Sequence, residues 1–291
     1  MNFGQEIHPG NRWQKRYSYY WIAVAAVFVV AAGGMIGYGV YRAVGQDAEE
    51  SGPATRALEE LWEMAGPHIE TPEQRLERVR MEASVAGYPK SVIEMLDKNP
   101  ATVTYVEHYG EKKGQIYAED IGEDYVDGQI PLLIQWDERW GYAPYGTSVV
   151  GASGCGPTCI AMVAAGLNHD PSITPAKVAA YGTQNQSVDS ENNTYWTFMQ
   201  EAASAYGLSC YNGLLTEEEL SAELSAGHPV ICSMGPGYFT QNGHFIVMTG
   251  YENGQITIND PFSTENSGRT WTYGEIHDQI KAMWVYQTSQ G

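Results

Sequence analysis

The arrangement of apolar residues divides the chain into a membrane-length run, a helical region and a mixed region that ends in strands. Between Tyr17 and Tyr41 there is no charged side chain, and Trp21 to Val40 is mostly Ala, Val, Ile, Gly and Phe. A helix needs about 20 such residues to cross a bilayer core. Tyr and Trp side chains gather at both ends of the run, as in the aromatic belt of a membrane helix. The pattern predicts a transmembrane segment over residues 19–41.

The charges beside this run predict its orientation. Residues 1–18 carry three basic side chains, and acidic side chains dominate soon after the run. By the positive-inside rule, residues 1–18 form a cytoplasmic tail and the later part of the chain lies outside the cell membrane. The alternative is a cleaved signal peptide with small residues at Ala43 and Gly45. Because the run exceeds the usual signal-peptide core of about 7–15 residues, we favour an uncleaved signal anchor.

Residues 42–128 are interpreted as a linker followed by a helical flank. The first of them are polar and acidic, which is typical of a short linker. Residues 71–74 (TPEQ) have the form of a capping box with proline in the first turn, and a short helix is expected between Pro89 and Asn99. Residues 101–128 are acidic and less periodic, and we expect a loop that wraps the next domain. The helices show no clustered metal-ligand pattern, so the expected role is structural.

Residues 129–289 change from helical to strand patterns. Apolar residues at helical spacing recur in four stretches, which begin at Cys155, Thr174, Tyr195 and Thr216. From Pro229 onward there are four apolar runs of strand length: residues 230–234, 245–248, 255–258 and 284–286. The pair Asn253-Gly254 between two of these runs is a hairpin signal. Helices followed by an antiparallel sheet predict an α+β fold for this domain.

The glycine-rich residues 154–157 (GCGP) predict a tight turn that enters a helix. Glycine permits unusual backbone angles, and proline suits the first helical turn. A cysteine at a helix N-terminus lies near the positive end of the helix dipole, which favours the nucleophilic thiolate. Taken alone, Cys155 is better explained as a small buried apolar residue. Its partners further along the chain favour a catalytic role instead.

A thiolate nucleophile needs a base and a group that orients this base. His244 begins an apolar strand after the glycine-rich residues 235–243. Asp260 follows the neighbouring strand, and antiparallel pairing would bring it beside His244, where a carboxylate can fix the imidazole tautomer. Residues 259–261 (NDP) are alternatively a simple turn. Beside His244 and Cys155, we favour the catalytic role for Asp260.

Gln135 is the candidate oxyanion donor, because its amide can point at a developing negative charge. It precedes Cys155 by 20 residues. Cys159 lies one helical turn after Cys155 and is most simply a core residue. A metal site of Cys155, Cys159 and His244 has weak support, since such zinc sites generally use a second cysteine pair. We therefore expect no metal and no cofactor.

Composition and charge exclude some classes of partner. The chain has 291 residues, a hydrophobic content of 43% and a net charge of -19, which suits a globular core. Residues 1–46 carry four basic side chains and one acidic one, whereas the remaining chain carries 12 basic and 34 acidic ones. Such an acidic body makes nucleic acid an unsuitable partner. Four cysteines make no dense disulfide framework, and Cys210 and Cys232 either form a disulfide or are buried and free.

The run from Ile130 to Tyr286 resembles a C39-like cysteine peptidase domain of the papain-like superfamily. The resemblance lies in IPLLIQWD (130–137), GASGCGPTCIAMV (151–163), AGHPVICSMGPG (226–237), GHFIVMTGY (243–251) and ITINDP (256–261). The whole chain is similar to surface proteins of Gram-positive bacteria that carry a membrane anchor and a helical flank before such a domain. This resemblance implies a papain-like fold. Its implied roles are nucleophile, general base and acid, orienting residue and oxyanion donor, for Cys155, His244, Asp260 and Gln135 respectively.

The resemblance implies hydrolysis of a peptide or cell-wall peptide through a thioester, outside the cell. C39 peptidases of transporters cut leader peptides after double glycine on the cytoplasmic side. This chain has no GxxxxGK[ST] nucleotide-binding motif, and its predicted topology places the domain outside, which argues against leader processing. Two alternatives stay open. One is an inactive module of the same fold that binds cell-wall peptides or a partner protein. The other is an enzyme that cuts or transfers a different amide bond, such as a cell-wall amidase.

Overall fold

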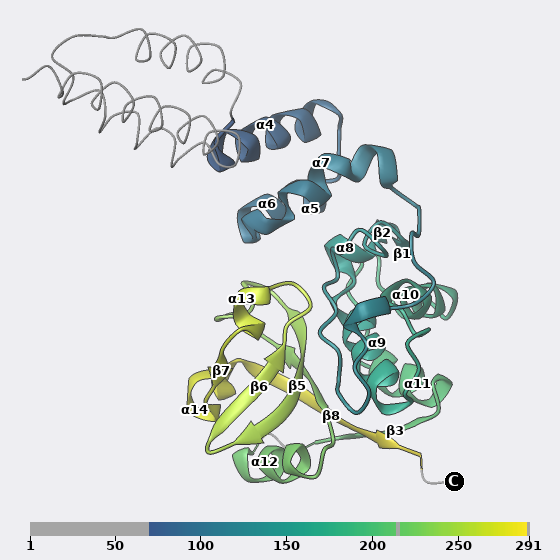
Figure 1. Cartoon of the computed structure of the whole chain (residues 1–291), viewed down its shortest axis with the longest axis vertical. Coiled ribbons are helices and arrows are strands. Elements are labelled where there is room, and N and C mark those ends of the chain that lie inside the picture. The colour runs from purple at the N-terminus through teal and green to yellow at the C-terminus, as the bar shows by residue number, and fades with distance from the viewer. Residues whose placement is uncertain (1–69, 214–215, 290–291) are drawn as a thin grey trace, which may run out of the picture. The chain divides into compact units, whose positions relative to one another are not determined.

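The computed structural model describes residues 70–213 and 216–289 (Figure 1). Residues Leu76–Gly291 form one compact unit. The predicted tail, transmembrane segment 19–41 and most of the linker lie outside the described residues. Among the residues that are described, no helix combines the length and the apolar character that crossing a bilayer requires.

Short helices form the flank between residue 72 and residue 124. They are α4 (Pro72–Val85), α5 (Lys90–Ile93), α6 (Met95–Lys98), η2 (Pro100–Thr102), α7 (Val103–Lys112) and η3 (Gly122–Asp124). The predicted capping box is confirmed, because the Gln74 N–H donates to Thr71 Oγ1 at 3.2 Å and the Thr71 N–H donates to Gln74 Oε1 at 2.9 Å. The short helix expected after Pro89 is present as two pieces, α5 and α6.

The expectation of a loop over residues 101–128 is wrong for its first part, which forms α7. This helix buries Tyr105, Val106 and Tyr109 in a core shared with Tyr142 and Val149. Their spacing places them on one face of a helix. Packing of these aromatic side chains stabilises a helix whose composition is otherwise polar, which local propensity alone does not predict.

Helix α9 (Cys155–Leu167) packs against three others: α8 (Val150–Ser153), α10 (Pro175–Gln184) and α11 (Phe198–Ala205). Helix α9 is buried on all sides from Gly156 to Gly166, which its small side chains allow. Thr174 caps α10 by accepting from the Lys177 N–H at 3.3 Å. Helix α11 begins three residues later than the pattern predicted; Thr194 pairs with Val188 in an isolated β-bridge, and the Tyr195 N–H donates to the Ser187 carbonyl at 2.9 Å.

One six-stranded antiparallel sheet follows in the order β3-β8-β4-β5-β6-β7, so the α+β fold of residues 129–289 is confirmed (Figure 1). Its strands are β3 (Leu208–Asn212), β4 (Val230–Met234), β5 (His244–Glu252), β6 (Gln255–Asn259), β7 (Thr270–Trp271) and β8 (Ile280–Thr288). The four predicted strands are confirmed; β3 and β7, at the two edges, were not predicted. A small hairpin of β1 (Pro144–Tyr145) and β2 (Ser148–Val149) precedes α8.

The sheet buries both faces, because alternate side chains of a strand point to opposite sides. Helix α9 packs on β5 and β8, and α12 (Glu217–Ser225) packs on β4 and β5. The hydrophobic cluster on the α9 side of the sheet contains these strand residues: Ile231, Phe245, Val247, Trp284 and Tyr286. The hydrophobic cluster on the α12 side contains the alternate strand residues Val230, Cys232, Met234, Ile246 and Met248. The short elements α13 (Thr264–Ser267), α14 (Tyr273–Ile276) and η4 (His277–Gln279) join the later strands.

The hairpin between β5 and β6 sets the register that the candidate site depends on. Asn253 and Gly254 turn the chain with positive φ values of 52° and 78°, as a two-residue hairpin requires. Val247 then lies opposite Asn259. The residues after β6 therefore return along the beginning of β5, where His244 is.

Candidate active site

Cys155 begins α9, as the sequence predicts. Close packing explains the glycines on both sides of it. A Cβ atom at Gly154 would lie 2.5 Å from the Val150 carbonyl oxygen, and one at Gly156 would lie 2.7 Å from Thr194 Oγ1. Both positions therefore exclude a side chain. The thiol is half-buried at the positive end of the helix.

The Cys155 thiol has three polar neighbours. It contacts the His244 ring, and the backbone N–H groups of Phe245 and Gly156 point at its sulfur. Burial of the thiol opposes ionisation, but the His244 imidazolium and these N–H donors favour the thiolate more strongly. The pKa of Cys155 is therefore lowered from its ordinary value.

His244 stands at the first position of β5 and links Cys155 to Asp260. Its Nε2 donates to Asp260 Oδ1 at 2.8 Å, which leaves Nδ1 as the ring nitrogen for the thiol. The exposed fraction is 9% for the His244 side chain and 1% for that of Asp260, so water screens this pair weakly. Burial alone would lower the pKa of His244. The Asp260 carboxylate outweighs burial and, with the Cys155 contact, raises the pKa of His244 to about 10.

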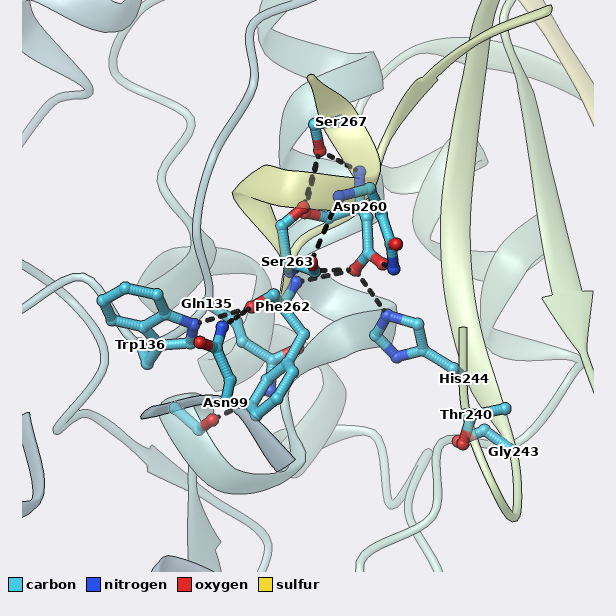
Figure 2. A network of polar contacts seen from close by, with 12 residues as sticks. Asn99, Gln135, Trp136, Thr240, Gly243, His244, Asp260, Phe262, Ser263 and Ser267 are labelled. Atoms are coloured by element: carbon cyan, nitrogen blue, oxygen red, sulfur yellow. Dashed lines mark hydrogen bonds and ion pairs between the residues drawn. The ribbon is translucent and has the colours of Figure 1, made fainter. Parts of the chain in front are cut away.

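Asp260 is held by a ring of donors in the loop after β6 (Figure 2). Besides His244, its Oδ1 accepts from the N–H of Phe262 at 2.8 Å and from that of Ser263 at 3.3 Å. Its Oδ2 accepts from Asn266 Nδ2 at 2.8 Å. Burial opposes the charged form, but the His244 imidazolium and these donors outweigh it, so the pKa of Asp260 is lowered. The carboxylate is thus charged and fixed in direction.

Gln135 is buried next to this loop. Its backbone N–H donates to the Pro261 carbonyl at 2.8 Å, and its Nε2 donates to the Gly151 carbonyl at 2.8 Å. A side-chain amide has a second N–H, so one donor of Nε2 is not needed by Gly151. The Oε1 atom of Gln135 is buried without a hydrogen-bond partner, which is costly in a folded protein.

The other cysteines are apart from this chemistry. All four cysteines are free, so the alternative of a disulfide between Cys210 and Cys232 is excluded in this structure. Cys159 is fully buried in the core around α9, and burial raises its pKa well above the ordinary value. Within residues 70–213 and 216–289, no group of three or more His, Cys, Asp or Glu side chains is placed to hold a metal ion.

Sequence reasoning missed three side chains in the same network. Asn266 holds Asp260 directly, while Asn99 and Trp136 both donate to the carbonyl of Phe262. The position of Asn266 could have been found from the local sequence. Ser263 is a typical N-cap residue, and its Oγ caps α13 by accepting from the Asn266 N–H at 3.2 Å. Asn99 has none, since it is 163 positions away from Phe262 in the sequence.

The chain matches one protein family by sequence and resembles several solved structures at low sequence identity. The sequence model of the Peptidase_C39 like family matches residues 128–291. No curated protein sequence matches the chain.

Several solved structures resemble the chain at low sequence identity, and three of them are as follows. The peptidase domain of Streptococcus ComA, a bi-functional ABC transporter involved in a quorum sensing pathway, is 20% identical, with 47% of this chain and 93% of that chain covered and a TM-score of 0.35. A C39-like peptidase from Bacillus anthracis is 16% identical, with 56% and 96% covered and a TM-score of 0.39. A double glycine motif protease from an AMS/PCAT transporter, in complex with the leader peptide, is 15% identical, with 59% and 99% covered and a TM-score of 0.36.

Proposed function

Since the chain belongs to the Peptidase_C39 like family, we propose that it is a cysteine peptidase whose nucleophile, base and orienting residue are Cys155, His244 and Asp260. The observation that carries this proposal is the contact of the Cys155 thiol with a His244 ring whose far nitrogen is held by a buried carboxylate. This is the arrangement that makes a thiol nucleophilic and supplies a proton to the leaving group.

The proposed reaction has two halves. The Cys155 thiolate attacks the peptide carbonyl carbon, a C–S bond forms, and the carbonyl electrons move to oxygen. When this oxyanion collapses, the C–N bond breaks and His244 gives its Nδ1 proton to the leaving amine. Neutral His244 then takes a proton from water, and the hydroxide attacks the thioester carbon. When the second oxyanion collapses, the C–S bond breaks and the Cys155 thiolate leaves. The products are an amine, a carboxylic acid and the regenerated Cys155–His244 pair.

Two donors are proposed for the oxyanion. The Cys155 backbone N–H is one of the first N–H groups of α9, which have no partner within the helix. The second N–H of Gln135 Nε2 is the other. The bond from Nε2 to the Gly151 carbonyl supports this role, because it fixes the plane of the amide. Gln135 thus contributes a donor whose direction is set before substrate binds.

Location and substrate are part of the proposal. We infer an anchor over residues 19–41 that leaves the peptidase domain outside the cell membrane, where it cuts peptides or cell-wall peptides. The apolar run and the basic side chains before it support this topology. External protease added to intact cells should digest the domain. Protection from that protease would contradict the proposed topology.

The test of the chemistry uses the Cys155 thiol itself. The full-length protein is alkylated with iodoacetamide from about pH 4 to pH 9, and each cysteine is followed by mass spectrometry. Cys155 should react well below the free-thiol pKa of about 8.5, and His244→Ala should remove this reactivity. Buried Cys159 and Cys232 serve as internal controls. An inert Cys155, or one that reacts like a free thiol, would favour the alternative of an inactive module that binds wall peptides or a partner.

A fluorogenic peptide library then identifies the bond that is cut. Peptides with a double glycine should be included, because C39 peptidases of transporters cut leader peptides after this motif. Cleavage that is lost in Cys155→Ala supports the peptidase. Reactive Cys155 without any peptide cleavage would direct the search to other amide bonds, such as those cut by a cell-wall amidase.

A further inference from the structure

The helical flank, which precedes the part matched by the family, reaches into the loop that carries Asp260. Asn99 follows α6 and comes immediately before η2. Its Nδ2 donates to the Phe262 carbonyl at 2.9 Å, while its Oδ1 accepts from the Ala101 N–H at 3.0 Å. Because both ends of the side-chain amide are used, the direction of its donor is fixed.

The Phe262 carbonyl has a second donor. Trp136 Nε1 donates to it at 3.0 Å, and Figure 2 shows the Asn99 and Trp136 side chains pointing at Phe262 from the same side. A carbonyl oxygen has two lone pairs, so two donors satisfy it. This carbonyl is thus held by the flank and by the segment that contains Gln135.

The peptide group that contains this carbonyl also contains the N–H of Ser263. This N–H points at Asp260 Oδ1 from 3.3 Å. A peptide group is planar, so the donors that fix its carbonyl also fix the direction of its N–H. Hydrogen bonds to the carbonyl further polarise the N–H on the other side of the group. Asn99 therefore acts on Asp260 through one rigid unit.

Asp260 Oδ1 is also the atom that accepts from His244 Nε2. We infer that Asn99 is a positioning residue for the proposed catalytic set: through the peptide group between Phe262 and Ser263, it orients Asp260 toward His244. This inference rests on the proposed function. It makes the flank a part of the catalytic unit, beyond the structural role expected from sequence.

Other contacts also hold the flank against the domain. A positioning effect of Asn99 can therefore be distinguished from an effect on folding. The Tyr105 hydroxyl donates to the Gly141 carbonyl at 2.8 Å, and Lys112 pairs with Glu138 at 2.6 Å. Tyr105 stacks on Tyr142 with ring centroids 4.5 Å apart. Loss of the Asn99 donor alone should therefore leave the flank attached.

The experiment compares two variants of Asn99 with a matched control. Asn99→Asp keeps the acceptor for Ala101 and loses the donor to Phe262. Asn99→Ser keeps an oxygen that can cap η2 and cannot reach Phe262. The control is Asn168→Asp, which also removes a long-range Nδ2 bond to a backbone carbonyl, that of Tyr206 at 2.7 Å, at the far end of α9.

The readout is the iodoacetamide rate of Cys155 against pH in the full-length protein, with thermal melting alongside. Both Asn99 variants should lower this rate at neutral pH by about three- to tenfold, the size expected for loss of one hydrogen bond, and move the rise of the profile to higher pH. Asn168→Asp should match the wild type. Trp136→Phe, which removes the other donor, should shift the profile in the same direction.

Each outcome decides one claim. If wild-type Cys155 shows no reactivity dependent on His244, the proposed function fails. If the wild type is reactive and the Asn99 variants share its pH profile, the positioning role is overturned while the proposed function stands. Equal losses in Asn99→Ser and Asn168→Asp, with equal falls in melting temperature, would also overturn it.

Discussion

Cys155 and Cys159 lie one helical turn apart on α9, yet their surroundings give them opposite chemistry. Cys155 is half-buried at the helix N-terminus, and His244 and two backbone N–H groups lower its pKa. Cys159 is fully buried in the apolar core, and burial raises its pKa well above the ordinary value. The same side chain on the same helix is thus stabilised as a thiolate in one place and as a thiol in the other.

The neighbouring groups, more than the residue type, make a cysteine nucleophilic in this protein. Burial opposes the thiolate at both positions. Cys155 contacts His244, the first residue of β5. The buried ion pair of His244 with Asp260 keeps the imidazole protonated. The helix dipole adds to this effect, but it weakens beyond the first turn.

The largest expected effect comes from removing the reactive member of this pair of cysteines. Cys155→Ala should abolish peptide cleavage, a loss of at least about a thousandfold in kcat, because the thiolate forms the bond to the substrate carbonyl carbon. Melting should change little. The check is a cleavage assay beside thermal melting. Retained cleavage in this variant would refute Cys155 as the nucleophile.

The next effect concerns what distinguishes the surroundings of Cys155. Asp260→Ala removes the carboxylate that holds His244 Nε2, so the imidazolium should lose stability and the pKa of His244 should fall. We expect kcat to decrease about a hundredfold with a smaller change in KM. Steady-state kinetics measures both. A KM effect alone would instead assign Asp260 to substrate binding.

The pH profile should reflect the two shifted groups. Cleavage needs the Cys155 thiolate and the His244 imidazolium together, so kcat/KM should rise as pH passes the lowered pKa of Cys155 and fall as pH passes about 10, where His244 loses its proton. Outside these limits the rate should change about tenfold per pH unit. A fall near the ordinary histidine pKa of about 6.5 would contradict the imidazolium.

The same ion pair links pH to folding. The pKa of His244 is raised on folding, so its contribution to the free energy of unfolding is fully present below the ordinary histidine pKa of about 6.5. This contribution is lost as pH rises through about 10. Chemical denaturation at several pH values should show the loss in the wild type and not in His244→Ala.

A smaller effect is expected from the support of Asp260. Asn266→Ala removes the donor to Oδ2, and one hydrogen bond to a charged group suggests a decrease in kcat of about tenfold. The fall of kcat/KM at high pH should move to lower pH, because a less firmly held Asp260 carboxylate stabilises the His244 imidazolium less. Asn266→Asp places a second carboxylate beside Asp260 and should be more damaging than Asn266→Ala. The reverse order would contradict the role of Asn266 as donor.

The smallest effect on activity is expected for the buried cysteine. Cys159→Ala leaves a small cavity in the core and should lower the free energy of unfolding by about 1 kcal/mol. The iodoacetamide profile of Cys155 should stay as in the wild type. Urea denaturation and alkylation measure the two quantities. A shifted Cys155 profile would show that the two cysteines are coupled and would break the contrast between them.

Much of the site could be predicted because its signals are local. The glycines around Cys155 mark a helix start, and the apolar run after His244 marks a strand. The turn at Asn253-Gly254 joins the strands that hold His244 and precede Asp260, so even their meeting follows from a short hairpin. Each of these features depends on residues close together in the chain.

The errors lie where long-range packing decides the structure. Helix α7 was expected to be a loop, because its stability comes from Tyr105 and Tyr109 in a core shared with distant residues. Strand β3 lies at an edge of the sheet beside β8, and its last two residues, Tyr211 and Asn212, are exposed, so its sequence has no apolar run. Local propensity is a weak guide in both cases.

The local pattern of residues thus specified the helix start that activates Cys155, the four inner strands of the sheet and the pairing of His244 with Asp260. Tertiary packing alone specified which distant groups hold that pair in place, such as Asn99 against Phe262. The physical reason is the distance along the chain over which each interaction acts. Helix caps, turns and hydrophobic periods act over a few residues, whereas burial and hydrogen bonds between remote segments exist only once the chain has folded.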